Sequence, residues 1–199
     1  MAGFLFTKNI IHMKKKTIPV IFLEGKRLYL RPIESRDIPL MQRYVNDPEI
    51  RCYLSNSYPV SLLAEQAYAE KKMKHDPNDI TLAICLKKGD RFIGLMGLHR
   101  IDYINRIATT GSVIGEKSQW NKGYGQEAKA LLLEYAFDTL NLRKVSSAAI
   151  AGNKRSIQHN IKCGYRIEGI LRKEFFKNGR YYDKVMLGVF KESWKKHKK

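Results

Sequence analysis

Two glycines, Gly123 and Gly125, stand where a strand-like segment gives way to a helical pattern. Residues 109–114 before the loop are typical of a strand. After the loop, residues 126–140 carry apolar side chains at the spacing of one buried helical face, namely Ala128, Leu131, Leu132, Tyr135 and Ala136. At such a junction, unpaired backbone N–H groups and the positive end of the helix dipole converge. The loop therefore predicts a seat for a pyrophosphate, and a glycine turn that only reverses the chain is the alternative.

The loop differs from the two common nucleotide-binding loops. The Walker pattern needs a longer glycine spacing followed by Lys-Ser/Thr, which is absent here. Gly123-x-Gly125-x-x-Ala128 fits the dinucleotide-binding fingerprint in spacing, but that fingerprint belongs in the first βαβ unit, and this loop lies past the middle of the chain. The bare glycine pattern thus leaves the ligand undetermined.

The strands and helices that position this loop alternate along the chain. The predicted strands cover residues 28–31, 80–86, 92–101, 109–114 and 144–150, and two more flank the hairpin signal Asn178-Gly179. The predicted helices begin at Ser35, Ser61, Gln126 and Asn153 or Ser156, and they end at Pro48, near His75, at Leu140 and at Gly164. In the first helix we expect Ile38, Met41 and Val45 to face inward. The order is that of an α/β (α+β) domain.

The composition indicates one soluble globular domain. Of the 199 residues, 44% are hydrophobic and 11% aromatic, which excludes a disordered chain. No apolar run approaches the roughly 18 residues that span a bilayer, so we expect no membrane partner. Lysines followed by apolar residues near the N-terminus mimic a signal peptide, but a proline interrupts the run. We expect a tail or edge segment over residues 1–22, the domain over 23–190 and a basic tail over 191–199.

Charge and cysteine content narrow the function classes. The first sixteen residues carry +4 and residues 191–199 another +4, which leaves +10 of the total +18 on the domain. Such a field attracts anions and repels polycations. Cys52, Cys85 and Cys163 are scattered without metal-ligand spacing. We therefore expect no metal cofactor and interpret the cysteines as packing residues in a reducing cytoplasm.

The flanks of the glycine loop resemble the GCN5-related N-acetyltransferase (GNAT) superfamily. Its pattern Gln/Arg-x-x-Gly-x-Gly/Ala lies between the fourth strand and the following helix and binds the pyrophosphate of acetyl-CoA. Trp120, Gly123 and Gly125 occupy the first, fourth and sixth positions here. The run Trp-x-Lys-Gly-Tyr-x-x-Glu-Ala, with Trp in place of Gln/Arg, is similar to the branch that contains ribosomal-protein N-terminal acetyltransferases.

The likeness covers nearly the whole chain from Leu23 onward. Residues 28–38 resemble the first strand and helix of the family, residues 153–165 its late helix, and residues 174–181 the last hairpin of spermidine acetyltransferases. The resemblance implies the GNAT fold: a mixed, mostly antiparallel central sheet flanked by helices, whose fourth and fifth strands splay apart and hold acetyl-CoA.

The resemblance also implies which residues hold acetyl-CoA as co-substrate. Strand positions pair with the pantetheine arm, backbone N–H groups of the loop hold the pyrophosphate, and an asparagine meets the pantetheine amide. The corresponding residues here are Val113, Ile114 and Gly115 for the arm, Trp120, Lys122, Gly123, Tyr124 and Gly125 for the loop, and Asn153 and Asn160 on the late helix.

Transfer requires a proton to leave the acceptor ammonium and another to reach the departing thiolate. Where many relatives carry a tyrosine near the thiolate, this chain has Asn160, which donates a hydrogen bond but no proton. Tyr165 or water is the alternative donor. Thr110 replaces an acidic residue that some relatives carry. A water chain or one of four side chains then acts as base: His99, Asp102, Glu168 or Glu174.

The sequence thus predicts an acetyl-CoA-dependent N-acetyltransferase acting on a primary amine. A protein or peptide N-terminus or a small amine is the expected acceptor, because the positive field repels polycations; spermidine or another polyamine, suggested by the last hairpin, is the alternative. Two other classes stay open: a nucleic-acid-binding module and a GNAT fold that binds CoA without catalysis. No helix carries a dense Lys/Arg face, so nucleic acid is not the expected partner. The oligomeric state is left open, with a homodimer as one option.

Overall fold

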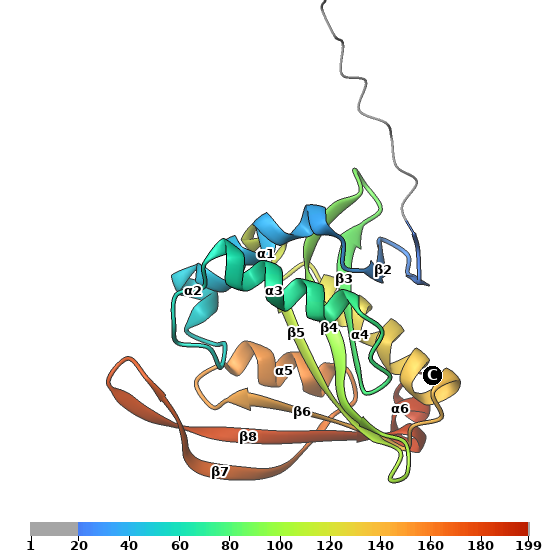
Figure 1. Cartoon of the computed structure of the whole chain (residues 1–199). Helices are drawn as coiled ribbons and strands as arrows, with labels where there is room; N and C mark the ends of the chain where they lie inside the picture. Colours follow the sequence, from blue (N-terminus) through green and yellow to red (C-terminus); the bar gives the residue numbers. More distant parts are fainter. Residues whose placement is uncertain (1–19, 199) are drawn as a thin grey trace, which may run out of the picture.

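One eight-stranded sheet runs through the computed structural model, which describes residues 20–198 (Figure 1). The strands lie in the order β1-β2-β3-β4-β5-β6-β8-β7. Their bounds are β1 (Leu23–Glu24), β2 (Leu28–Pro32), β3 (Asp79–Leu86), β4 (Arg91–Asp102), β5 (Ile107–Ile114), β6 (Lys144–Ile150), β7 (Arg166–Lys177) and β8 (Arg180–Phe190). Every neighbouring pair is antiparallel except β5 and β6, which are parallel. The mixed, mostly antiparallel sheet expected from the sequence is confirmed.

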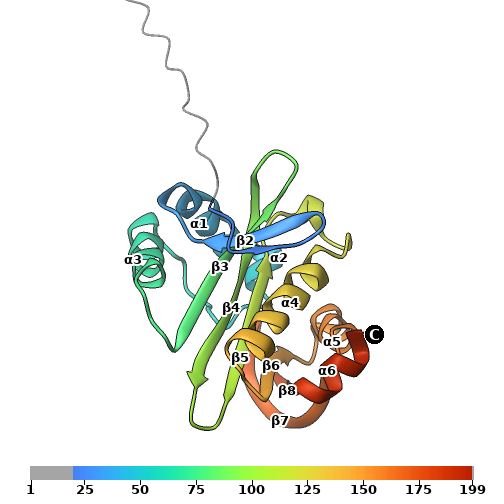
Figure 2. The ribbon, with the colours of Figure 1, turned by 90° about the vertical axis from the view of Figure 1, so that its right-hand side faces the viewer.

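Helices cover both faces of the sheet. They are α1 (Ile38–Asn46), α2 (Pro48–Arg51), α3 (Leu62–Met73), α4 (Tyr124–Glu134), α5 (Lys154–Lys162) and α6 (Lys191–Lys198). Two 3₁₀ turns, η1 (Ser35–Asp37) and η2 (Lys117–Gln119), and a π-helical segment after α4, η3 (Tyr135–Thr139), complete the set. Figure 2 shows α1 and α3 on one face and α4, α5 and α6 on the other. One apolar cluster lies on each face, the first around Met41 and Tyr44 and the second around Leu132 and Phe137.

Cap residues explain where the early helices begin. The Ser61 hydroxyl accepts a hydrogen bond from the Ala64 N–H at 3.1 Å, which confirms the predicted N-cap of α3. The prediction that Ser35 caps the first helix is wrong: Glu34 and Asp37 form a capping box around η1, and α1 starts after it. Asp37 is held there by a buried ion pair with Arg31 at 2.7 Å.

The apolar face of the first helix also differs in one position from the prediction. Ile38 and Met41 are buried as expected, but Val45 is only partly buried and Tyr44 takes the third inward place. The tyrosine ring stacks on Phe92 of β4, with the ring centroids 5.9 Å apart. A large aromatic side chain thus fills the space between α1 and the sheet.

Residues in the left-handed conformation end two elements where the sequence predicted it. Gly164, with φ 91°, follows α5 and terminates it. Asn178 and Gly179, with φ 49° and 78°, form the tight turn of the β7–β8 hairpin. This long hairpin lies at the edge of the sheet, beside β6.

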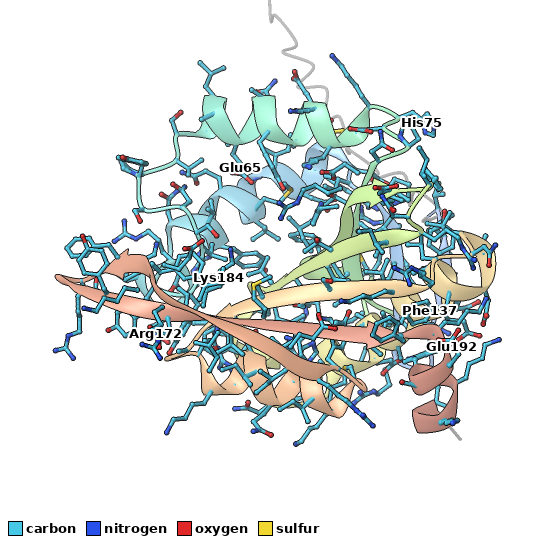
Figure 3. The ribbon with its side chains drawn as sticks, turned by 90° about the horizontal axis from the view of Figure 1, so that it is seen from below. Glu65, His75, Phe137, Arg172, Lys184 and Glu192 are labelled. Atoms are coloured by element: carbon cyan, nitrogen blue, oxygen red, sulfur yellow. The ribbon has the colours of Figure 1, made fainter. Side chains whose placement is uncertain are left out.

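The segment expected as a basic tail contains a helix after β8. Residues 191–198 form α6, whose Trp194 is 4% exposed and packs on the Phe137 ring at 5.5 Å. Figure 3 shows Phe137 beside this end of the molecule, near Glu192 of α6. The expected tail over residues 1–22 lies almost wholly outside the described residues. Within them, no helix is long and apolar enough to cross a membrane.

Candidate active site

The parallel strands β5 and β6 separate after a short stretch of pairing. Thr109 and Ser146 are the last residues that face each other in register. Beyond them β5 continues beside β4, and β6 continues beside β8, so their facing edges carry backbone groups without a strand partner. A cavity of about 730 Å³ opens between the two strands, the first turns of α4 and the length of α5. If the two-residue strand β1 is left out of the count, β5 and β6 are the fourth and fifth strands of the fold. Their predicted splay is confirmed.

The glycine loop forms the mouth of this cavity. Gly123 is the N-cap of α4 and has φ 79°, a conformation that side-chain-bearing residues rarely adopt. Arg27 fixes the loop, because its Nη1 donates to the Lys122 carbonyl at 2.8 Å and its Nε to Glu127 at 2.7 Å. Lys122, Gly123, Tyr124 and Gly125 all line the cavity. The first N–H groups of α4 have no acceptor inside the helix and are available to an anion there.

The residues at the end of β5 differ in whether they line the cavity. Val113 and Ile114, which were predicted to lie beside the pantetheine arm, line the cavity. The Ile114 carbonyl, however, accepts the indole N–H of Trp120 at 2.7 Å. The Gly115 N–H donates to the Ile93 carbonyl at 2.8 Å, and Gly115 does not line the cavity. The structure therefore brings Val113, Ile114 and Trp120 together at the cavity but places Gly115 behind it.

Helix α5 contributes the opposite wall. Asn153 lines the cavity and caps α5, since its side-chain oxygen accepts the Ser156 N–H at 3.0 Å. The guanidinium of Arg155 lies 4.0 Å from the centre of the Trp120 ring. His159, one turn further, is partly buried, and its Nε2 is a buried atom without a hydrogen-bond partner. Burial, helped by the nearby Lys129 charge, lowers the pKa of His159 to about 3.

A buried lysine lies at the closed end of the cavity. Lys129 of α4 is 1% exposed, and its Nζ donates to Asn160 Oδ1 at 2.7 Å and to Thr110 Oγ1 at 3.3 Å. The Asn160 amide nitrogen in turn donates to the Ser156 carbonyl at 2.9 Å. Burial lowers the pKa of Lys129 to about 8. Lys129, Thr110 and Asn160 all line the cavity.

The predicted proton donors and bases are scattered. Tyr165 is 2% exposed, its hydroxyl lies 3.4 Å from Thr110 Oγ1, and burial raises its pKa; it does not line the cavity. His99 bonds to Asp79 at 3.0 Å away from the cavity lining. The acidic candidates also lie elsewhere: Asp102 binds Asn105, Glu168 pairs with Lys144, and Glu174 with Lys184. Of the predicted catalytic residues, Asn160 alone lines the cavity.

Sequence reasoning missed Lys129, and a signal for it was present. Lys129, Leu132, Leu133 and Ala136 share the spacing i, i+3, i+4 and i+7, and all four are buried. A lysine within an apolar helical stripe marks a buried charge. Leu131 and Tyr135, which were expected in the stripe, are only partly buried, because the buried face is rotated toward Leu133 and Phe137.

Comparisons with known proteins agree with this geometry. Residues 27–166 match the model of the acetyltransferase (GNAT) domain family. The chain belongs to this family. It is 30% identical to an uncharacterized N-acetyltransferase, p20, of Bacillus licheniformis, over 86% of this chain and 97% of that protein. It is 28% identical to a spermidine N(1)-acetyltransferase of Escherichia coli, over 83% and 87% of the two chains.

A solved structure shows the same fold. The spermidine N-acetyltransferase of Vibrio cholerae, in complex with CoA and spermine, superposes with a TM-score of 0.78 at 27% identity, over 84% of this chain and 98% of that one. The protein is accordingly a GNAT N-acetyltransferase, and acetyl-CoA is its co-substrate. Among the described residues no cluster of metal-ligating side chains is present.

Proposed function

We propose that this enzyme binds acetyl-CoA between β5 and β6 and transfers its acetyl group to a primary amine that is not a polycation. The cavity that opens at the glycine loop and closes at Thr110 and Lys129 carries the proposal. Its mouth offers helix N–H groups to a pyrophosphate, and its walls are strand edges without partners. An extended pantetheine arm has amide groups that such edges can bind.

The same geometry explains how transfer is promoted. The enzyme has to hold the thioester carbonyl beside an attacking amine, and positioning supplies much of the rate enhancement of such reactions. Val113 and Ile114 line one wall of the cavity, and Asn153 lines the other. We assign Val113, Ile114 and Asn153 to the pantetheine arm, and the loop Lys122, Gly123, Tyr124 and Gly125 to the pyrophosphate. Trp120, clamped between Ile114 and Arg155, shapes the mouth.

The charge of the cavity supports an acceptor that is neutral or negative. Its lining includes Lys122, Lys129, Arg155 and Lys162 but no aspartate or glutamate. Glu65 of α3, a buried carboxyl whose pKa burial raises, lies on the α1 side of its helix in Figure 3 and does not line the cavity. A polyamine carries several positive charges and would meet none of the carboxylates that normally bind them.

The acceptor side of the cavity is built from two distant parts of the chain. Tyr53, Leu54 and Ser55 line it, and the next residues are tied to the β7–β8 hairpin. Lys177 Nζ donates to the Asn56 carbonyl at 3.1 Å and to the Ser57 hydroxyl at 2.9 Å. Arg172 projects from the same hairpin in Figure 3. A peptide N-terminus or a small amine fits beside such a loop, and a negative group on it would be attracted by these cations.

The relatives named above make spermidine the competing acceptor, and a direct comparison separates the two. Purified enzyme with acetyl-CoA is offered an acidic peptide, a neutral peptide, a small monoamine and spermidine, and CoA release is followed with a thiol reagent. We expect kcat/KM for the best peptide or monoamine to exceed that for spermidine. Preference for spermidine overturns the acceptor assignment, and absence of turnover with every amine favours a CoA-binding protein without catalysis.

A further inference from the structure

We infer that Lys129 is a catalytic residue: its ammonium faces the sulfur of acetyl-CoA and gives that sulfur a proton as CoA leaves. The inference rests on the proposed function, because it requires acetyl-CoA in the cavity between β5 and β6. It supplies the proton donor that Asn160 cannot be, since an amide does not give up a proton at useful pH.

The first argument is the burial of an unpaired charge. Lys129 is 1% exposed, yet within the part of the chain that the structure describes no carboxylate lies at ion-pair distance from its Nζ. Lysine is rarely buried fully without such a partner, because an ammonium loses its hydration there. Methionine or leucine would fill the same place in the apolar stripe at less cost. A lysine at this position therefore points to a use for its charge.

The second argument is the direction of the ammonium group. Asn160 and Thr110 each accept one of its N–H groups, at 2.7 and 3.3 Å. Its Nζ also lies 5.1 Å from the centre of the Tyr165 ring. No oxygen or nitrogen acceptor among residues 20–196 receives its third N–H, and Lys129 lines the cavity. The Ser156 carbonyl holds the Asn160 amide so that its oxygen faces Lys129. Asn160 is thus a positioning residue, and the remaining N–H is available to a ligand.

The third argument is the place of Lys129 along the cavity. Thr110 is the first residue of β5 beyond the last paired residue, so it marks the closed end of the gap. The glycine loop follows the other end of the same strand. From Ile114 to Thr110 an extended strand covers about 13 Å. An arm that starts with its pyrophosphate at the loop and runs along β5 brings its far end, the thioester, to Thr110 and Lys129.

Lys129 is also the main charge at this end of the cavity. The titratable groups that face it are His159 on α5 and, after that helix, Cys163 and Tyr165. The pKa values of Cys163 and Tyr165 are raised by burial and that of His159 is lowered, so all three are neutral near pH 7. A departing thiolate would meet one positive charge and no negative one. The lowered pKa of Lys129 suits a proton donor that works near neutral pH.

The proton balance of the step is complete. The neutral acceptor nitrogen forms a bond to the carbonyl carbon, and the bond between that carbon and sulfur breaks. Sulfur takes the electron pair of the broken bond and a proton from Lys129 Nζ. The acceptor nitrogen loses a proton to water, and after CoA departs a proton from water recharges the lysine. The products are the amide and CoA with a free thiol.

The test is the pKa of the CoA thiol bound to the enzyme, read from the ultraviolet absorbance of the thiolate during a pH titration. We expect the wild-type enzyme to lower that pKa by at least about one unit relative to free CoA, because a thiolate beside an ammonium is stabilised. In Lys129→Met the shift should disappear while CoA still binds. Once an acceptor is known, kcat of this variant should fall about 100-fold, with KM for acetyl-CoA little changed.

Two further variants make the titration decisive. Lys122→Met removes a lysine at the cavity mouth, so it should weaken CoA binding but leave the thiol pKa lowered. Lys129→Gln keeps a polar group of similar length and serves if the methionine variant does not fold. A bound thiol whose pKa is the same in wild type and in the Lys129 variants overturns the inference. Failure of wild-type enzyme to bind CoA at all instead overturns the proposed function.

Discussion

Replacement of Lys129 by methionine should change how the stability of the protein depends on pH. Burial lowers the pKa of Lys129 from 10.5 to about 8. Below pH 8 the lysine is charged in both the folded and the unfolded chain, and the folded state carries the full penalty of burying that charge. Between pH 8 and 10.5 the folded chain releases the proton while the unfolded chain keeps it, so the free energy of unfolding rises with pH.

The size of the effect follows from the same shift. At about 1.36 kcal/mol per pKa unit, the penalty amounts to about 3 kcal/mol at pH 7 and falls below about 1 kcal/mol at pH 10. Lys129→Met lacks the titrating group. Its free energy of unfolding relative to wild type should therefore drop by about 2 to 3 kcal/mol between these two pH values. The loss of the hydrogen bond to Asn160 adds a difference that does not depend on pH.

Urea denaturation at pH 7, 8, 9 and 10 measures this difference. Lys71→Met is the matched control, because it makes the same replacement at a lysine that is exposed on α3. The other lysines and the tyrosines are present in both proteins, so their contributions to the pH dependence cancel in the difference. A difference between wild type and Lys129→Met that stays constant over this pH range would refute the burial of an unpaired ammonium.

Three other perturbations test separate parts of the structure. Between pH 7 and pH 4.5, His159→Gln should gain about 2 to 3 kcal/mol of stability relative to wild type. The folded-state pKa of about 3 keeps His159 neutral while the unfolded chain takes up a proton below pH 6.5; equal acid denaturation of the two proteins would contradict this. Asp37→Asn should lower the free energy of unfolding in urea by about 3 kcal/mol, because it leaves the Arg31 guanidinium buried without its partner. A loss below about 1 kcal/mol would count against that ion pair. Gly125→Glu should weaken acetyl-CoA binding, measured by calorimetry, at least about 100-fold, which is about 2.7 kcal/mol. Gly169→Glu is the control, because a side chain added there meets open space and should leave the affinity unchanged. Equal affinities of the two variants for acetyl-CoA would mean that the loop does not hold the pyrophosphate.

Local signals in the sequence were enough to predict most of the elements. The Asn178-Gly179 turn and the Ser61 cap depend on neighbouring residues only, and both are found as predicted. The Ser35 prediction failed because Asp37 is drawn into an ion pair with Arg31, a residue of the preceding strand. Which side chain caps a helix there depends on a contact that local patterns do not show.

The candidate site likewise has a part that local sequence patterns predict and a part that depends on packing. The glycine loop could be found from sequence, because its function depends on backbone conformation and on a helix that starts beside it. At the closed end, Asn160 was predicted from sequence, but its contact and that of Thr110 with Lys129 were not. These three residues come from three elements and meet only when α4 and α5 pack on β5. Tyr165 and His99 were reasonable candidates by residue type, but packing places one behind the cavity and the other beside Asp79.

Thermal unfolding with and without acetyl-CoA, beside ATP and NAD, tests the central claim most directly. A ligand that binds the folded chain alone stabilises it by about 2.7 kcal/mol at a hundredfold excess over its dissociation constant. We predict a rise in Tm with acetyl-CoA that ATP and NAD do not produce and that Gly125→Glu abolishes. A folded sample whose Tm does not change at millimolar acetyl-CoA would contradict the assignment of the cavity between β5 and β6.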